Sequence, residues 1–240
     1  MYYDLGYEIT QIISRREAFL KYSGPGRDQA VQFYSHTKLY PPTYYNSVVR
    51  KITVNMYMTL DGYGEFAKYP GSDVEEEEPN DFWKEMWISR YESVDTIVFG
   101  RRSYEGHAQV HGLSKRKPTD PKYMFDYSRF LEKCKLVVLS NTLKNAPWGN
   151  SRIMKGDLSE LVKKLKGEPG KDIIVEGGPS LAHDFIRLRL ADEYRILVMP
   201  VIFGRGPHYW GPMENQETLK LIGVKILTYG EMILHYESVR

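Results

Sequence analysis

A single acidic residue, Glu176, follows the apolar run Ile173–Val175 and precedes two glycines. The run predicts a short buried strand. A carboxyl group at the end of such a strand lies against apolar walls, which raise its pKa and let it donate or relay a proton. Glu176 is therefore a candidate acid or substrate anchor. The alternative is a carboxylate that only hydrogen-bonds the loop backbone or a partner subunit.

The residues after Glu176 favour an anion site. Gly177 and Gly178 stand before Pro179, and an amphipathic pattern follows. Glycine lets a ligand approach the backbone closely, and proline is well tolerated at the first helical position. The first turn of a helix offers free N–H groups and a partial positive charge. This arrangement fits a pyrophosphate cradle; the alternative is a simple turn.

Two further strand ends carry groups that bind phosphate. These groups are Gly100, Arg101, Arg102 and Ser103 after one apolar run, and Ser140, Asn141 and Thr142 after another. Arginine forks onto phosphate oxygens. Ligands of open α/β sheets bind beyond the carboxyl ends of the strands, so we expect the three strand ends to share one site. Taken alone, the arginine pair would be an ordinary solvated surface pair.

Asp61 is a second candidate for substrate contact, because an Asp-Gly pair ends the expected strand Lys51–Gly62. The alternative is that the pair only makes a turn. No metal site is expected. His107 and His111 are four residues apart but lack the glutamate of a zincin motif, and Cys134 is the only cysteine.

Strands and helices alternate along the chain from residue 51. This alternation predicts an α/β fold with a mixed, mostly parallel sheet covered by helices on both faces, and an antiparallel hairpin that turns near Tyr229–Gly230 closes it. Strands are expected at 51–62, 95–100, 135–140, 172–178 and 193–204, helices at 81–93, 157–166 and 179–190, a helix or turn at 101–106, a loop at 111–127, a turn region at 141–150 and the hairpin at 219–238.

Composition bounds the class of protein. The 240 residues include 33 basic and 31 acidic side chains, a balance that gives no electrostatic reason to expect nucleic acid or a membrane surface as partner. One cysteine suits a reducing cytoplasm. Residues 1–48 hold eight of the nineteen tyrosines and one expected helix near Ile9–Leu20. We interpret 1–48 as an arm that packs on the main domain or on a second subunit, with a loosely ordered tail as the alternative, and 49–240 as one domain.

The three strand ends, in this order, resemble the dihydrofolate-reductase-like family. They are most similar to the reductase domain of the bifunctional riboflavin-biosynthesis deaminase–reductase and its stand-alone bacterial relatives. The resemblance covers about residues 50–240, and each motif alone is weak. The matching segments are TLDGYGE (59–65), TIVFGRRSYEG (96–106), KLVVLSNTL (135–143), DIIVEGGPSL (172–181) and LADEYRILVMPVIFGRG (190–206).

The resemblance implies a three-layer fold, NADPH as cofactor and hydride transfer to a small pterin- or pyrimidine-like or carbonyl substrate. It implies that Glu176 lies near the substrate and that Asp61 is the acid of the LDG turn. It also implies cofactor contacts: Gly100, Arg101, Arg102 and Ser103 with phosphates, Ser140 and Thr142 with the adenosine 2′-phosphate, and Gly177, Gly178, Ser180 and Leu181 with the pyrophosphate and nicotinamide.

A homodimer is expected, because the reductase domain of that relative pairs and the terminal hairpin offers an edge. Asn55 departs from the riboflavin branch, which has a lysine at this position, and the zinc deaminase half has no counterpart in the chain. The alternative function is a nucleotide-binding protein of the same fold without catalytic turnover.

Overall fold

The structure is a computed structural model that describes residues 19–21, 30–32, 50–64 and 80–239. Its contacts divide the chain into two compact units, Met1–Ser47 and Val48–Arg240. In the first unit, strands β1 (Phe19–Lys21) and β2 (Ala30–Gln32) pair antiparallel. The helix expected near Ile9–Leu20 lies outside the described residues except at its end, where the structure has β1 instead. The role of an arm for residues 1–48 stays a prediction.

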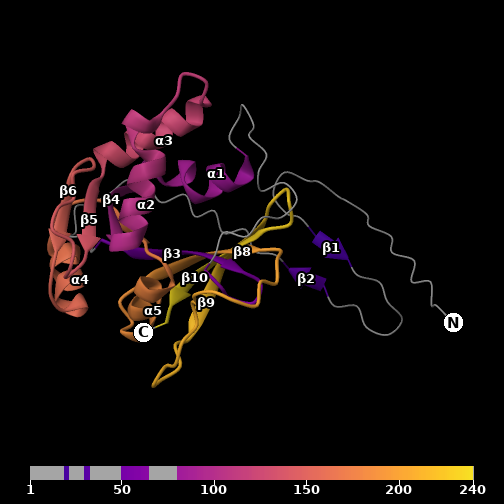
Figure 1. Cartoon of the computed structure of the whole chain (residues 1–240). Helices are drawn as coiled ribbons and strands as arrows, with labels where there is room; N and C mark the ends of the chain where they lie inside the picture. The colour runs from indigo at the N-terminus through magenta and orange to yellow at the C-terminus, as the bar shows by residue number, and fades with distance from the viewer. Residues whose placement is uncertain (1–18, 22–29, 33–49, 65–79, 240) are drawn as a thin grey trace, which may run out of the picture. The chain divides into compact units, whose positions relative to one another are not determined.

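The second unit is built on one sheet of eight strands, in the order β6-β5-β4-β7-β3-β8-β10-β9 (Figure 1). The pairs from β6 to β8 are parallel, and the pairs of β10 with β8 and β9 are antiparallel. The strands are β3 (Ile52–Thr59), β4 (Val94–Gly100), β5 (Lys135–Leu139), β6 (Ser151–Met154), β7 (Asp172–Glu176), β8 (Glu193–Met199), β9 (Leu219–Ile226) and β10 (Met232–Ser238). The predicted mixed, mostly parallel sheet with a closing hairpin is confirmed.

Helices cover both faces of the sheet, which gives three layers (Figure 1). One core cluster joins the sheet to α4 and α5, and the other joins it to α1, α2 and α3. The helices are α1 (Asp81–Met86), α2 (Arg101–His111), α3 (Lys122–Lys133), α4 (Leu158–Gly167) and α5 (Pro179–Arg187). Two short 3₁₀ turns, Ile88–Arg90 and Leu113–Lys115, follow α1 and α2.

Two expectations for individual elements were wrong, and one strand was not expected. The loop expected at 111–127 contains the start of α3, whose buried face includes Tyr127, Phe130 and Leu131; the prolines before it masked this helical spacing. The turn region expected at 141–150 contains no helix or strand, but the four-residue edge strand that follows it, β6, was too short to give a pattern. The strand expected at 193–204 ends at Met199, since Pro200 cannot donate to the ladder.

The pleat of two adjacent strands decides which side chains meet. Alternate residues of a strand point to opposite faces, and Val54 of β3 pairs with Val175 of β7. Both valines belong to the core on the side of α4 and α5. The next residues, Asn55 and Glu176, therefore point together to the side of α1, α2 and α3. The register of β3 against β7 thus brings Glu176 to a defined neighbour.

Candidate active site

A cavity of about 390 Å³ lies at the carboxyl ends of β3 and β7, under α1, α2 and α3. This volume is near the lower end of the range for drug-sized ligands, whose pockets span about 300–1,000 Å³. The lining residues come from four helices, two strands and the segments that connect them. They are Tyr57, Gly64, Phe82, Trp83, Trp87, Ser103, His107, His111, Tyr127, Glu176, Gly177, Gly178, Pro179 and Tyr209.

Glu176 is the acidic residue of this lining, and its side chain is buried at 4% exposure. The Asn55 side-chain amide and the Tyr57 hydroxyl both donate to its Oε1, the latter over 3.1 Å. Burial raises the pKa of Glu176 to about 8, although these two donors oppose the increase. Neither donor carries a positive charge. The carboxyl group is therefore mostly protonated at neutral pH and can donate a proton into the cavity.

Aromatic rings form the opposite wall. Tyr127 packs its ring 5.2 Å from that of Trp83 and 4.6 Å from that of Trp87. Tyr127 is 1% exposed, and its hydroxyl is buried without a hydrogen-bond partner. Leaving a buried donor unpaired costs about 1–3 kcal/mol. A ligand with a polar edge would remove that cost.

The two histidines of α2 are uncharged at neutral pH. Burial lowers the pKa of His107, and it lowers the pKa of His111 to about 3 with help from His107 and Arg116. His107 Nδ1 lies 2.9 Å from the backbone oxygen of Ser103, so this nitrogen carries the proton and Nε2 is left as an acceptor. Among the residues that the structure describes, no group of three or more His, Cys, Asp and Glu side chains is placed to hold a metal ion.

Two helices that begin at strand ends have a glycine at the N-cap, so no N-cap side chain accepts a hydrogen bond from the N–H groups of the first turn. Gly100 precedes α2 and Gly178 precedes α5, both without a cap, whereas α1 and α4 are capped by Asn80 and Asp157. A side chain at Gly178 would begin only 4.0 Å from the hydroxyl of Ser103, so the two helix starts are neighbours. Their free N–H groups make this a place for phosphate.

Gly177 has a steric reason to be glycine. A Cβ atom there would lie 2.8 Å from the Cβ atom of Leu181, too close for real atoms. Leu181 also approaches Gly100, with 3.7 Å from its Cδ2 to the position of a Cβ. Leu181 thus packs under both strand ends and fixes their spacing. Backbone rather than side chain is presented to a ligand at Gly177.

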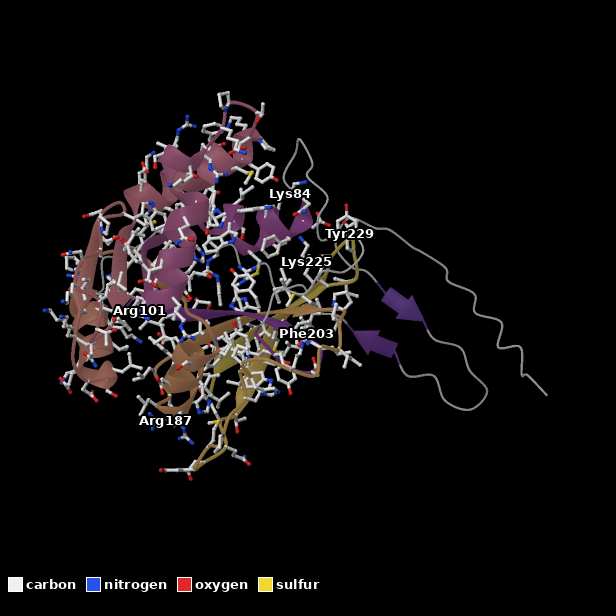
Figure 2. All side chains as sticks on the ribbon, viewed as in Figure 1. Lys84, Arg101, Arg187, Phe203, Lys225 and Tyr229 are labelled. Carbon is white, nitrogen blue, oxygen red and sulfur yellow. The ribbon has the colours of Figure 1, made fainter. Side chains whose placement is uncertain are left out.

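Apart from Ser103, the side chains predicted to bind phosphate lie outside the cavity. Arg101 and Arg102 are exposed in the first turn of α2, where Figure 2 labels Arg101; Arg101 Nε is 4.0 Å from the Glu105 carboxylate. Ser140 accepts hydrogen bonds from the backbone N–H groups of Thr142 and Leu143. It follows β5, the strand beside β4.

Asp61 lies in a turn and not in the cavity lining. Its carboxylate accepts hydrogen bonds from the backbone N–H groups of Phe203 and Gly204. The Thr59 hydroxyl donates to it over 2.6 Å, and this bond, with the backbone donors, lowers the pKa of Asp61 to about 2. The turn leads to Gly64, whose missing side chain leaves room for Pro179 and Tyr209. Asp61 therefore shapes the loop that reaches the cavity.

The structure brings Glu176, Gly177, Gly178 and Ser103 together in one cavity, with Gly100 and Leu181 packed behind them. Arg101, Arg102 and the exposed Ser180 are outside, at the starts of the two helices. Ser140 and Thr142 lie at the next strand end, and Asp61 is apart. Sequence reasoning missed Asn55 as the partner of Glu176, and it missed Tyr127 because α3 was not expected. The alternation of β3 was the available signal for Asn55 and Tyr57.

Within the described residues, no helix is both long and apolar enough to cross a bilayer. Two solved structures share the fold. A putative riboflavin biosynthesis protein from Shewanella sp. PV-4 matches with a TM-score of 0.57 and 20% identity, over 79% of this chain and 99% of its own. A pyrimidine reductase-like protein from Corynebacterium diphtheriae matches with a TM-score of 0.54 and 15% identity, over 81% and 94%.

Two proteins of Bacillus subtilis (strain 168) are similar in sequence, and both are described as uncharacterized. YwjB is 30% identical over 194 residues, which cover 78% of this chain and 97% of YwjB. YyaP is 29% identical over 196 residues, 79% of this chain and 96% of YyaP. The RibD C-terminal domain family matches residues 50–235, the same region as the strand-end motifs. The chain belongs to the RibD C-terminal domain family.

Proposed function

We propose that the protein is an NADPH-dependent reductase that transfers hydride to a C=N or C=O group of a small heterocyclic or carbonyl substrate. Membership of the family supports an oxidoreductase in general. The observation that carries the finer proposal is Glu176, a carboxyl group that holds its proton near neutral pH inside a cavity beside two uncapped helix starts.

The residues fit a phosphorylated dinucleotide. Gly100 and Gly178 open the two helix N-termini that would hold the pyrophosphate, and Gly177 keeps the approach clear. Arg101 and Arg102 are exposed at the start of α2 and would hold the 2′-phosphate by forked hydrogen bonds. When bound, NADPH supplies hydride from C4 of its nicotinamide ring.

Glu176 supplies the other half of the reduction. The Glu176 carboxyl group would give its proton to the nitrogen or oxygen of the C=N or C=O group, while the carbon of that group would take the hydride that bound NADPH would supply. Solvent would then return a proton to Glu176. Asn55 and Tyr57 hold the carboxyl group in place through their hydrogen bonds.

The test has two measurements on the whole chain. NADPH at 100 times its Kd should raise the free energy of unfolding by about 2.7 kcal/mol, measured by thermal denaturation. Loss of absorbance at 340 nm then reports turnover across pterins, flavin precursors and dicarbonyls. NADPH binding with a blank across the whole panel would favour a nucleotide-binding protein without turnover. Absence of any NADPH effect on unfolding would overturn both functions.

Cofactor preference tests the arginines. The double variant Arg101→Ala/Arg102→Ala should lose NADPH affinity at least tenfold more than NADH affinity, because only NADPH carries the 2′-phosphate. Arg187→Ala is the matched control, since Arg187 is also exposed and paired within its helix, 3.5 Å from Asp184, but at the other end of α5. Equal losses of affinity for NADPH and NADH would mean that Arg101 and Arg102 do not bind the 2′-phosphate.

A homodimer is part of the proposal. β9 is the last strand of the sheet, and the side chains of Ile222, Val224 and Ile226 on one of its faces are 43%, 54% and 72% exposed. Exposed apolar edge strands commonly pair with another chain. Val224→Glu should shift the elution volume in size-exclusion chromatography from dimer to monomer, whereas Lys220→Glu on the same strand should not. An unchanged elution volume for Val224→Glu would place any dimer contact elsewhere.

A further inference from the structure

We infer that the substrate is an uncharged, planar ring compound, without the phosphate or carboxylate that would need a cation in the cavity. This inference rests on the proposed function, since it names the substrate class of the same site. The observations that carry it are the types of side chain on the cavity wall, the state of its two histidines and the neutral surroundings of Glu176.

The wall of the cavity is made for flat, apolar surfaces. Eight of its fourteen described lining residues are aromatic or histidine. Aromatic pairs gain about 0.5–1.5 kcal/mol beyond burial when they stack or meet edge to face, so a flat ring is the shape that this wall binds best. The cavity of about 390 Å³ must also admit the nicotinamide under the proposed function, which leaves space for one or two further rings.

No lysine or arginine is present among the described lining residues. The histidines do not replace them, because burial lowers the pKa of both His107 and His111 and leaves their rings neutral. An anionic group would therefore enter a buried site without an opposite charge, which is costly.

The polar groups of the wall suit the edge of a neutral ring. Protonated Glu176 is a donor, and the Tyr127 hydroxyl is a buried group without a partner. His107 Nε2 is an acceptor, because its Nδ1 is committed to the Ser103 carbonyl. Together they can receive a ring that has both acceptors, such as C=O or C=N, and an N–H or O–H donor.

Asn55 maintains this neutrality. Its amide donates to Glu176, so the carboxyl group is held by a hydrogen bond and not by an ion pair. A cation at this place would lower the pKa of Glu176 and provide a counter-charge for an anionic substrate. The neutral amide does neither.

Matched pairs of ligands test the inference on the protein without added cofactor at pH 7, so that no charged nicotinamide ring is present. The pairs are pterin against pterin-6-carboxylate, and 1,4-naphthoquinone against 1,4-naphthoquinone-2-sulfonate. Two of the four tryptophans, Trp83 and Trp87, line the cavity, so quenching of tryptophan fluorescence reports binding without turnover. The uncharged member of each pair should bind at least tenfold more tightly than its anionic partner.

Two variants sharpen the result. His111→Lys adds a cation to the wall and should reduce the preference for the uncharged member at least fivefold. Gln109→Lys adds the same charge to the exposed side of α2 and should leave the preference unchanged. The thermal unfolding midpoint of each variant shows whether it is folded, and the comparison in the unmodified protein stands without them.

Equal or tighter binding of the anionic members would overturn the inference, and so would failure of every member of both pairs to bind. Neither outcome touches the proposed cofactor, because NADPH binding is measured separately by thermal denaturation. A protein that fails to bind NADPH would lose the proposed function first.

Discussion

Glu176 and Glu193 are buried glutamates on the two strands that flank β3, with exposures of 4% and 8%. Glu176 ends β7, and Glu193 begins β8. β3 lies between these strands and contacts both: the Asn55 amide donates to Glu176, and the Thr53 hydroxyl is 3.5 Å from Glu193. The two β3 residues that make these contacts, Thr53 and Asn55, are two positions apart. The two glutamates are similarly buried, yet their protonation states at neutral pH are opposite.

The difference lies in the hydrogen-bond partners of the two carboxyl groups. Lys51 Nζ is 2.7 Å from one oxygen of Glu193, and His235 Nε2 is 3.0 Å from the other. Burial alone raises the pKa of Glu193, but the bonds from His235 and Lys51 outweigh it and lower the pKa to about 2. Glu176 has only neutral donors, so the effect of burial is larger than that of the two hydrogen bonds, and the pKa of Glu176 rises to about 8. Burial therefore makes an acid only where the neighbours are uncharged.

The largest effect is expected from Glu176→Gln. This variant keeps the shape and the hydrogen bond from Asn55 but cannot release a proton. Under the proposed function kcat should fall by roughly 10²–10⁴-fold, the usual contribution of a general acid, with NADPH affinity within twofold of the unmodified protein. Glu193→Gln, measured by the same loss of absorbance at 340 nm, should keep kcat within threefold. A Glu176→Gln variant with full kcat would remove Glu176 from the chemistry.

Stability should show the reverse order. Glu193→Gln removes the carboxylate that pairs with Lys51 and hydrogen-bonds His235 and should cost about 2–3 kcal/mol. This is less than the ~3–5 kcal/mol for breaking a fully buried pair, because the Lys51 side chain is half exposed and keeps water. Glu176→Gln should change the free energy of unfolding by less than about 1 kcal/mol at pH 4.5, where the Glu176 carboxyl group is protonated in the folded state and still about half protonated in the unfolded state, and no ion pair is lost. Urea denaturation measures both, and equal costs would contradict the comparison.

The two residues should also respond to pH in opposite directions. The pKa of Glu176 is raised from 4.5 to about 8, so its contribution to stability is complete below pH 4.5 and is lost as the pH rises to about 8. The pKa of Glu193 is lowered from 4.5 to about 2, so its contribution is complete above pH 4.5 and is lost as the pH falls toward 2.

Urea midpoints from pH 3 to 9 measure these two windows, each as the difference between the unmodified protein and one glutamine variant. Turnover that uses Glu176 as the acid should also decrease as the pH rises through about 8. A difference for Glu176→Gln that does not change between pH 4.5 and 8 would mean that the carboxyl group is ionised throughout.

The smallest effect is expected from Tyr127→Phe. The hydroxyl has no partner in the free protein, so its loss should leave the free energy of unfolding unchanged or raise it by up to about 1 kcal/mol. Under the proposed function, the missing hydrogen bond to the substrate should raise KM about two- to tenfold with little change in kcat. Tyr123→Phe, a tyrosine of the same helix outside the cavity lining, is the control. An unaffected KM would remove Tyr127 from the substrate contacts.

The strand ends could be predicted because each one is local in sequence. A run such as Ile173–Val175 predicts a buried strand, and the polar residues that follow it mark one edge of a parallel sheet. The site around Glu176 could not be predicted in this way. Asn55 is 121 residues away in sequence, and only the register between β3 and β7 makes it a neighbour.

The helix α3 shows a second reason why prediction from the sequence was incomplete. Tyr123, Tyr127, Phe130 and Leu131 have helical spacing, but the prolines and charges before Lys122 predicted a loop. Tertiary packing against Trp83 and Trp87 stabilises this helix more than local preference does. Tyr127, the ring that this helix adds to the wall of the cavity, was therefore missing from the expected site.

The acid and the backbone that would receive phosphate are consecutive residues, Glu176, Gly177 and Gly178. A negative charge bound at the start of α5 would lie close to the Glu176 carboxyl group, with little water between them to weaken the interaction. Such a charge would make ionisation of the carboxyl group still less favourable. Under the proposed function, occupancy of the dinucleotide site and retention of the proton would thus be coupled by proximity alone. The Glu176 carboxyl group would be most fully protonated, and so best able to deliver its proton, when NADPH is bound.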